Sequence, residues 1–213
     1  MRFLRFLVPG FALLALAVPS SALAAGGSGL TSSSAKSKTK NNTKKVTTAD
    51  NGGAGINGPA PGTSTPEHPM VTGNTAKIVN GVAYAPSYAP IEVKKAIWAG
   101  NQIRKKPYAV GGGHGTWNDS AYDCSGSVSY VLHAAGLLKT SEDSGTMESW
   151  GQQGAGQWIT VYTNPGHAFV EIAGIRLDTS AEQDPNPPSG TGPRWRPVMD
   201  TTNGFMARHP AAL

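Results

Sequence analysis

The chain of 213 residues contains a single cysteine, Cys124, within the stretch YDCSGSVSYVLHAAGLL at residues 122–138. A cysteine at the start of a helix can serve as a nucleophile, because the helix dipole and a nearby imidazole stabilise its thiolate. The N–H groups of the first turn can also stabilise an oxyanion formed by attack on a carbonyl. The neighbouring Asp123 opposes the thiolate charge, so a reactive thiol here needs a histidine partner. An intermolecular disulfide and a buried, inert cysteine are the alternatives.

Five histidines compete for the role of that partner: His68, His114, His133, His167 and His209. His133 lies nine residues after the cysteine, so it points to the opposite side of the expected helix. His68 precedes the expected domain, and His209 lies close to the C-terminus. His114 lies in a glycine-rich loop that can approach the cysteine. His167 begins an expected strand, which is a rigid position for a base, and it is the candidate that we favour.

A carboxylate that could orient His167 follows from the hairpin at residues 167–178. If Ala173 and Gly174 form a two-residue turn, Phe169 faces Asp178, and His167 lies diagonally from Asp178 on the same face of the sheet. A carboxylate at this place holds the imidazole and supports its charged form. Cys124, His167 and Asp178 therefore make a consistent nucleophile, base and orienting residue. The alternative is a structural cysteine beside a surface hairpin.

Two helices are expected before the hairpin, and the second of them begins near Cys124. Residues 90–106 open with Pro90 and end before Pro107, which are start and stop signals of a helix. The helix that begins near Cys124 has an apolar stripe within about 80° of the cysteine at about 100° per residue. The stripe consists of Val128, Val131, Leu132 and Ala135. Gly136 is a suitable C-terminal cap.

Strands are expected after the helices. Residues 157–162, 167–172 and 175–180 alternate and are separated by turn residues, which predicts three antiparallel strands, and residues 204–208 supply a last strand. Residues 184–193 form a proline-rich loop. Helices followed by a run of strands indicate an α+β domain, with the nucleophile at a helix N-terminus and the helices packed on an antiparallel sheet.

The first part of the chain is expected to lie outside this domain. Residues 1–24 combine early arginines, a short apolar run and the pattern Ala22-Leu23-Ala24, which is typical of a secretory signal peptide rather than a membrane span. Residues 25–76 are poor in large apolar groups and are expected to form a disordered linker. Residues 77–89 are expected to form a short strand or an ordered arm, and the domain is expected over residues 90–213.

The positive charge of the chain is concentrated in this first part. From Ser87 onward, ten basic residues face eleven acidic ones, so the expected domain is close to neutral. The lysines of AKSKTKNNTKK, residues 35–45, could contact anionic envelope polymers, or they could simply solvate a spacer. Basic residues are not interleaved with aromatic ones, so we expect no nucleic-acid partner.

Two motifs in combination resemble those of the NlpC-type cysteine peptidases, bacterial cell-wall hydrolases with a papain-like core. The motifs are YDCSGSVSYVLHAAGLL and, about 40 residues later, GHAFVEI, with LDTS closing the hairpin. The upstream PYAVGG is similar to the family's segment before the cysteine. The resemblance covers residues 90–180 and implies a papain-like NlpC-type fold for the domain.

The resemblance also implies roles for individual residues. Cys124 would be the thiolate, His167 the base and Asp178 the polar third residue. Tyr108 would lie beside the nucleophile, and Asp123 and Ser125 would bind the peptide stem, for instance through its amine.

Three positions depart from the family pattern. Val110 replaces a usual aromatic residue, Ser127 replaces a usual apolar one, and Asp178 stands where histidine is commoner. The first two affect the expected fit of the substrate, and the third changes the orienting group.

From these observations we expect a secreted or extracytoplasmic cysteine peptidase. It would hydrolyse an amide bond in peptidoglycan stem peptides, for instance between a D-glutamyl residue and a diamino acid, through a thioester and without a metal or organic cofactor. The alternatives are an N-acetylmuramoyl-L-alanine amidase, a non-catalytic wall-binding protein, and an acyl transferase in which an amine replaces water. No stable membrane insertion is expected after cleavage of the signal peptide.

Overall fold

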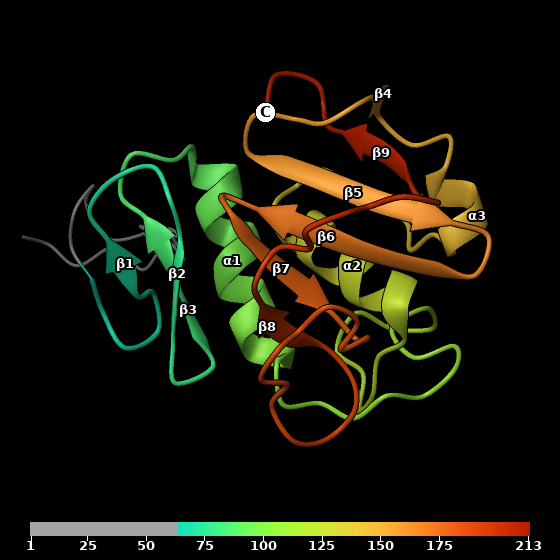
Figure 1. The fold of residues 1–213 in the computed structure, drawn as a ribbon, viewed down its shortest axis with the longest axis horizontal. Helices are drawn as coiled ribbons and strands as arrows, with labels where there is room; N and C mark the ends of the chain where they lie inside the picture. Colours follow the sequence, from blue (N-terminus) through green and yellow to red (C-terminus); the bar gives the residue numbers. More distant parts are fainter. Residues whose placement is uncertain (1–63) are drawn as a thin grey trace, which may run out of the picture. The chain divides into compact units, whose positions relative to one another are not determined.

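The computed structural model describes residues 64–213 (Figure 1). The predicted signal peptide and the predicted linker up to residue 63 lie outside the described residues. The described part contains three helices and two sheets, so the expected α+β class is confirmed at this level. Among residues 64–213, no helix has both the length and the apolar character needed to span a bilayer.

A small sheet precedes the first helix. Its strands are β1 (Met70–Val71), β2 (Lys77–Val79) and β3 (Val82–Pro86), with β3 in the middle. β1 runs parallel to β3, whereas β2 and β3 form an antiparallel hairpin. The hairpin turn is Asn80-Gly81, with φ of 50° and 73°. Both positive angles suit the two-residue turn that favours Asn-Gly.

This sheet corrects one expectation about the chain before residue 90 and makes another more precise. The predicted linker does not extend to residue 76, because β1 lies within it and Ala76 is buried, with its N–H bonded to Ala173 O at 2.9 Å. The expected strand or arm, residues 77–89, is the β2–β3 hairpin and the segment that follows it. Small alanines such as Ala83 allow β3 to pack closely on the first helix. A search for large apolar residues does not detect a strand of this kind.

Helix α1 (Ile91–Ile103) begins after Pro90, as predicted. Its Asn101 side chain accepts from Ala83 N at 2.9 Å and donates to Ala83 O at 2.8 Å, which fixes the small sheet against the helix. Gly100 lies where a Cβ atom would overlap the indole of Trp195. The glycine therefore lets the sheet that contains Trp195 approach the helix backbone.

Helix α2 (Cys124–Ala134) begins at the cysteine, as predicted. The helix is followed by Gly136, whose φ of 78° lies in the left-handed region and whose N–H donates to His133 O at 2.8 Å. This matches the expected glycine cap. A short helix that the sequence reading missed, α3 (Ser144–Met147), follows and is capped by the side chain of Asp143.

The large sheet has six antiparallel strands in the order β4-β9-β5-β6-β7-β8. The strands are β4 (Gln152–Gln153), β5 (Ile159–Asn164), β6 (His167–Ile172), β7 (Ile175–Asp178), β8 (Arg194–Arg196) and β9 (Met206–His209). Strands β5, β6, β7 and β9 match the four expected ones to within about two residues at each end. β4 and β8 were not expected, because each is only two or three residues long.

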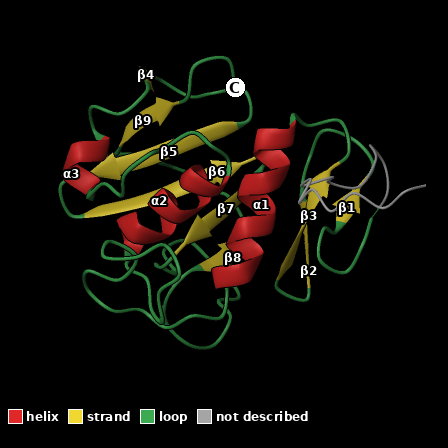
Figure 2. Cartoon of the chain, turned by 180° about the vertical axis from the view of Figure 1, so that it is seen from behind, coloured by secondary structure: helices red, strands yellow, loops and turns green. Residues whose placement is uncertain are grey.

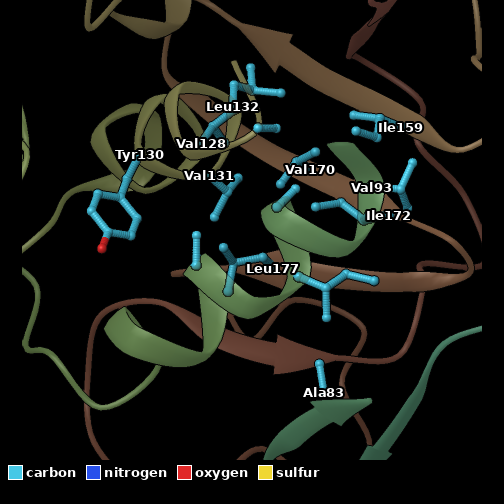
Figure 3. Packing of buried hydrophobic residues seen from close by; sticks show 14 of the residues in the cluster. Ala83, Val93, Val128, Tyr130, Val131, Leu132, Ile159, Val170, Ile172 and Leu177 are labelled. Carbon is cyan, nitrogen blue, oxygen red and sulfur yellow. The ribbon is translucent and has the colours of Figure 1, made fainter. Parts of the chain in front are cut away.

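Helices α1 and α2 cover one face of the large sheet, as the views from the two sides show (Figures 1 and 2). The core lies between these layers and includes Val93 of α1, Val128 and Leu132 of α2, and Val170 and Leu177 of the sheet (Figure 3). Each of these side chains is at most 1% exposed. The apolar stripe of α2 thus packs on β6 and β7, which brings the start of the helix to the strands that carry His167 and Asp178.

Candidate functional site

The first turn of α2 holds Cys124 in a fixed place. Asp123 is the N-cap, with an extended backbone, and its Oδ1 accepts from Gly126 N at 2.7 Å. Its Oδ2 accepts from Gly111 N at 2.9 Å, so the same carboxylate also ties the glycine-rich loop to the helix. A Cβ atom at Gly126 would overlap Gly112 O, so this contact requires glycine. The cap explains why an acidic residue precedes a thiol that should ionise.

His167 and Asp178 come together as the sequence predicted. The register of β6 and β7 pairs Val170 with Leu177 and Ile172 with Ile175, around the turn at residues 173–174. His167 Nε2 lies 2.9 Å from Asp178 Oδ1. The imidazole is partly exposed, whereas the carboxylate is only 1% exposed. Since Nε2 donates to Asp178, Nδ1 is the nitrogen that remains for the thiol.

The environment of Cys124 favours its thiolate. Burial disfavours the charged form, but hydrogen bonds from the His167 side chain and the Ala168 backbone, and the charge of His167, outweigh that effect. The pKa of Cys124 therefore lies below its ordinary value. The thiol is partly exposed and is in the free form, so a substrate carbonyl can reach it.

The imidazole shows the complementary change. Burial alone would lower the pKa of His167, but its hydrogen bonds to Asp178 and Cys124, together with their charges, raise it to about 9. A lowered thiol pKa beside a raised imidazole pKa favours a thiolate–imidazolium pair over the neutral pair. Such a pair is a nucleophile that also holds the proton needed by a leaving group.

The carboxylate of Asp178 is held by more than the imidazole. Its Oδ1 also accepts from Ser180 N at 2.8 Å, and its Oδ2 accepts from Arg176 Nη1 at 3.0 Å. The sequence reading missed Arg176, although a signal was present. Residues 176 and 178 of one strand point to the same face, which is also the face of His167.

The three residues with expected roles in substrate binding lie around the nucleophile. Tyr108 has its phenol partly exposed, and burial and the nearby Cys124 and Asp123 raise its pKa. Ser125 is 4% exposed, and its hydroxyl donates to Asp123 Oδ1 at 3.3 Å. Asp123 is largely engaged within the protein, since Oδ1 accepts from three groups and Oδ2 from Gly111.

His114 approaches the site, as expected, but on the side of the cap. Its Nε2 donates to Asp123 Oδ1 at 3.1 Å and contacts Ser125 Oγ at 3.2 Å, while Nδ1 accepts from Ser141 Oγ at 2.9 Å. His114 thus joins the cap to the segment before α3. A cavity of about 390 Å³ lies beside it, lined by residues 113–117 and 139–141. His114 supports Asp123 and Ser125 and is not placed as the base.

The other histidines lie elsewhere. His133 stacks on Trp117 with ring centroids 3.8 Å apart, which confirms that it faces away from the cysteine. His209 bonds Gly154 O through Nδ1 at 3.0 Å, and His68 packs on Trp98. Only His167 is therefore placed to act on Cys124 among the histidines of the chain.

The proline-rich loop, residues 184–193, borders the site on the side of Tyr108. Thr191 Oγ1 accepts from Tyr108 N at 3.2 Å, and Arg194 Nη1 donates to Lys106 O at 3.1 Å. At its other end, Asp184 pairs with Arg196 at 2.9 Å. The loop therefore links the segment of Tyr108 to the strands behind Asp178.

No protein-family model matches the chain, and no curated protein matches it. Within residues 64–213, no group of three or more His, Cys, Asp or Glu side chains is placed to hold a metal ion. The geometry of the site and the sequence motifs are therefore what indicates the function.

Proposed function

We propose that the protein is a cysteine peptidase that hydrolyses an amide bond in peptidoglycan stem peptides. The observation that carries the proposal is the 2.9 Å bond between His167 Nε2 and Asp178 Oδ1, with Cys124 at the N-terminus of α2 beside the same imidazole. This is the arrangement of nucleophile, base and orienting group that acyl transfer requires. The α+β layers, with the cysteine helix packed on an antiparallel sheet, are compatible with a papain-like NlpC-type fold.

The first half of the proposed reaction forms a thioester. The Cys124 sulfur attacks the carbonyl carbon of the scissile amide, a C–S bond forms, and the carbonyl oxygen becomes an oxyanion. The N–H groups of Gly126 and Ser127 are already bonded to Asp123. The N–H of Ser125 donates to the Cys124 sulfur. The N–H of Cys124 is therefore the first-turn donor that remains for the oxyanion. His167 then gives its proton to the leaving amine as the C–N bond breaks.

The second half releases the acid. Neutral His167 removes a proton from water, and the oxygen attacks the thioester carbonyl as the C–S bond breaks. The products are the carboxylic acid of the stem fragment and the thiolate–imidazolium pair of the resting enzyme. The carboxylate of Asp178 orients the ring through its bond to Nε2, as the carboxylate of a triad does.

The substrate class follows from the motif YDCSG and from the polar groups next to the thiol. Asp123, Ser125 and Tyr108 surround one side of the nucleophile, and among residues 64–213 Asp123 Oδ2 accepts a hydrogen bond from Gly111 N alone. The second lone-pair direction of Oδ2 is available to a protonated amine at the free end of a stem peptide. Such recognition favours short peptides with a free N-terminus over intact muropeptides that carry the sugar.

Digestion of purified stem peptides and muropeptides, followed by mass spectrometry, tests the proposal. The wild type is expected to cleave within the peptide under reducing conditions, and Cys124→Ala is expected to lose cleavage entirely. Fragments cut between the sugar and the first residue would instead indicate the amidase. Cross-linked products would indicate transfer to an amine. Intact substrates, with the thiol verified as free, would contradict the proposal, and wall binding retained by Cys124→Ala would then indicate a binding protein.

A further inference from the structure

An arginine with no exposed surface lies directly behind the candidate site. Arg176 is 0% exposed, and its Nη1 donates to Asp178 Oδ2 at 3.0 Å. The other oxygen of that carboxylate, Oδ1, accepts from His167 Nε2. The two oxygens therefore bind different groups: Oδ1 binds the imidazole and Oδ2 binds the guanidinium.

The guanidinium is itself fixed by two backbone carbonyls. Its Nε donates to Pro197 O at 3.1 Å, and its Nη2 donates to Glu182 O at 2.8 Å. Its Cζ lies 5.6 Å from the centroid of Phe169. Three nitrogens of one planar group thus point to three different acceptors, a geometry that a lysine ammonium cannot reproduce. The position of Arg176 is set by the protein and does not depend on Asp178 alone.

A second buried arginine provides a natural comparison. Arg196, on the adjacent strand β8, is 2% exposed and pairs with Asp184 Oδ2 at 2.9 Å. It contacts Asp178 only at the backbone, where its Nε donates to the carbonyl oxygen at 3.3 Å. Arg196 therefore resembles Arg176 in burial and charge, but it does not touch the carboxylate that orients the imidazole.

We propose that Arg176 is a positioning residue for the pair of Asp178 and His167. It holds the Asp178 carboxylate in the rotation that presents Oδ1 to Nε2, and so it turns Nδ1 of the imidazole toward Cys124. The inference rests on the proposed function, because it assigns Arg176 to the same nucleophilic site. It also explains how the chain uses aspartate where related motifs more often have histidine, since a buried carboxylate needs a counter-charge that a neutral imidazole does not.

The charged neighbours of this group are few. His167 is faced by Asp178 from β7 and by Cys124 from α2. Arg176 is faced by Asp178, by Arg196 and Asp184 on the loop side, and by Glu171 across the strand pair. Without the guanidinium, Asp178 keeps only His167 and Ser180 N as partners of its carboxylate. The carboxylate is then held less firmly in the rotation that presents Oδ1 to His167, and the thiolate–imidazolium pair loses its support.

The test measures the rate of Cys124 alkylation by iodoacetamide against pH in the full chain, which needs no peptidoglycan substrate. In Arg176→Met the pKa of Cys124 is expected to rise, so the thiolate fraction at pH 6.5 falls. Alkylation is then slowed, by up to about tenfold for each unit by which the pKa rises. Arg196→Met removes a buried arginine of similar exposure and is expected to lower the melting temperature while keeping the wild-type alkylation profile. Wild-type profiles in both folded variants would overturn the inference, since Arg176 would then be structural only.

Two further outcomes are distinguishable. If Arg176→Met does not fold, Arg176→Lys keeps the charge without the three-way hydrogen bonding. It is expected to shift the profile in the same direction by a smaller factor, and an unchanged profile in folded Arg176→Lys would overturn the inference. An ordinary thiol profile in the wild type would contradict the proposed function and the role of Arg176 together. A shifted wild-type profile that both variants keep would contradict the role of Arg176 alone.

Discussion

His167 Nε2 lies 2.9 Å from Asp178 Oδ1, and this bond decides which imidazole nitrogen meets the nucleophile. With Nε2 engaged, Nδ1 carries the exchange of the proton with Cys124. The two residues come from neighbouring antiparallel strands, so the bond depends on the register of one hairpin. A shift of that register by one residue would turn Asp178 to the other face of the sheet.

Replacement of Asp178 by asparagine is expected to lower kcat by about 10²-fold or more, within the range typical of acid–base groups. Asn keeps a hydrogen-bond acceptor but removes the charge that supports the imidazolium, and its NH₂ group can turn toward His167 and select the wrong tautomer. Steady-state cleavage of a stem peptide measures the effect. A kcat within twofold of wild type would show that Asp178 does not support the base.

The pH dependence of kcat/KM is expected to be bell-shaped, with its alkaline limb near pH 9. The pKa of His167 is raised to about 9, so the imidazole keeps its proton through neutral pH and loses the ability to protonate the leaving amine above that point. The acid limb reports the pKa of Cys124, which is lowered. It should therefore fall below the value of about 8.5 typical of a free thiol. Activity that only begins to rise above that value would contradict the ion pair.

The contributions of His167 and Cys124 to the free energy of unfolding change with pH in opposite directions. Because the folded pKa of His167 exceeds its unfolded value, its contribution is complete below about pH 6.5 and is lost as the pH rises through 9. The contribution of the Cys124 thiolate is present above the unfolded thiol pKa and is lost as the pH falls through its lowered folded pKa.

Loss of His114 is expected to raise KM more than it lowers kcat. The imidazole holds Asp123 and Ser125, which lie on the proposed amine-binding side, and it does not contact Cys124. A several-fold rise in KM for His114→Ala is therefore expected in steady-state kinetics. His133→Ala is the matched control, because that ring stacks on Trp117 instead. Equal effects of the two substitutions on KM would contradict the assignment.

Gly126→Ala is expected to reduce activity strongly, because the added Cβ atom would overlap the backbone oxygen of Gly112. The glycine-rich loop must then move away from the first turn of α2, and overpacking of this kind typically costs about 1–3 kcal/mol of stability. Thermal unfolding and peptide cleavage together measure the effect. Gly115→Ala, in the same loop, meets no atom within 4 Å and serves as the control. Wild-type activity in Gly126→Ala would show that the close contact is not needed.

The sequence predicts the site better than it predicts the edges of the fold. The turn Ala173-Gly174 and the alternation around it set the hairpin register, and that register alone places His167 diagonally from Asp178. The apolar stripe of α2 likewise fixes the side of the helix that carries Cys124. Both signals are local, because each is contained within about 15 residues.

Long-range contacts account for what the sequence reading missed. The small sheet is held by Asn101, whose side chain bonds the backbone of Ala83, 18 residues earlier in the chain. No local sequence pattern predicts that pairing. β8 is short and depends on its pairing with β7. Arg176 was missed for a different reason, since charged residues are almost never fully buried unless they are paired. Its partner Asp178 is two residues away on the same strand, but the carbonyl groups of Glu182 and Pro197 come from segments that the sequence alone does not bring to it.

The most direct test of the central claim is to trap the acyl-enzyme. Wild-type protein is mixed with a stem peptide, quenched in acid during turnover and analysed by intact-protein and peptide mass spectrometry. The account predicts an adduct on Cys124 with the mass of the acyl fragment, as a thioester that hydroxylamine removes, and none in Cys124→Ala. Cleavage of the peptide by Cys124→Ala at the wild-type rate would contradict it.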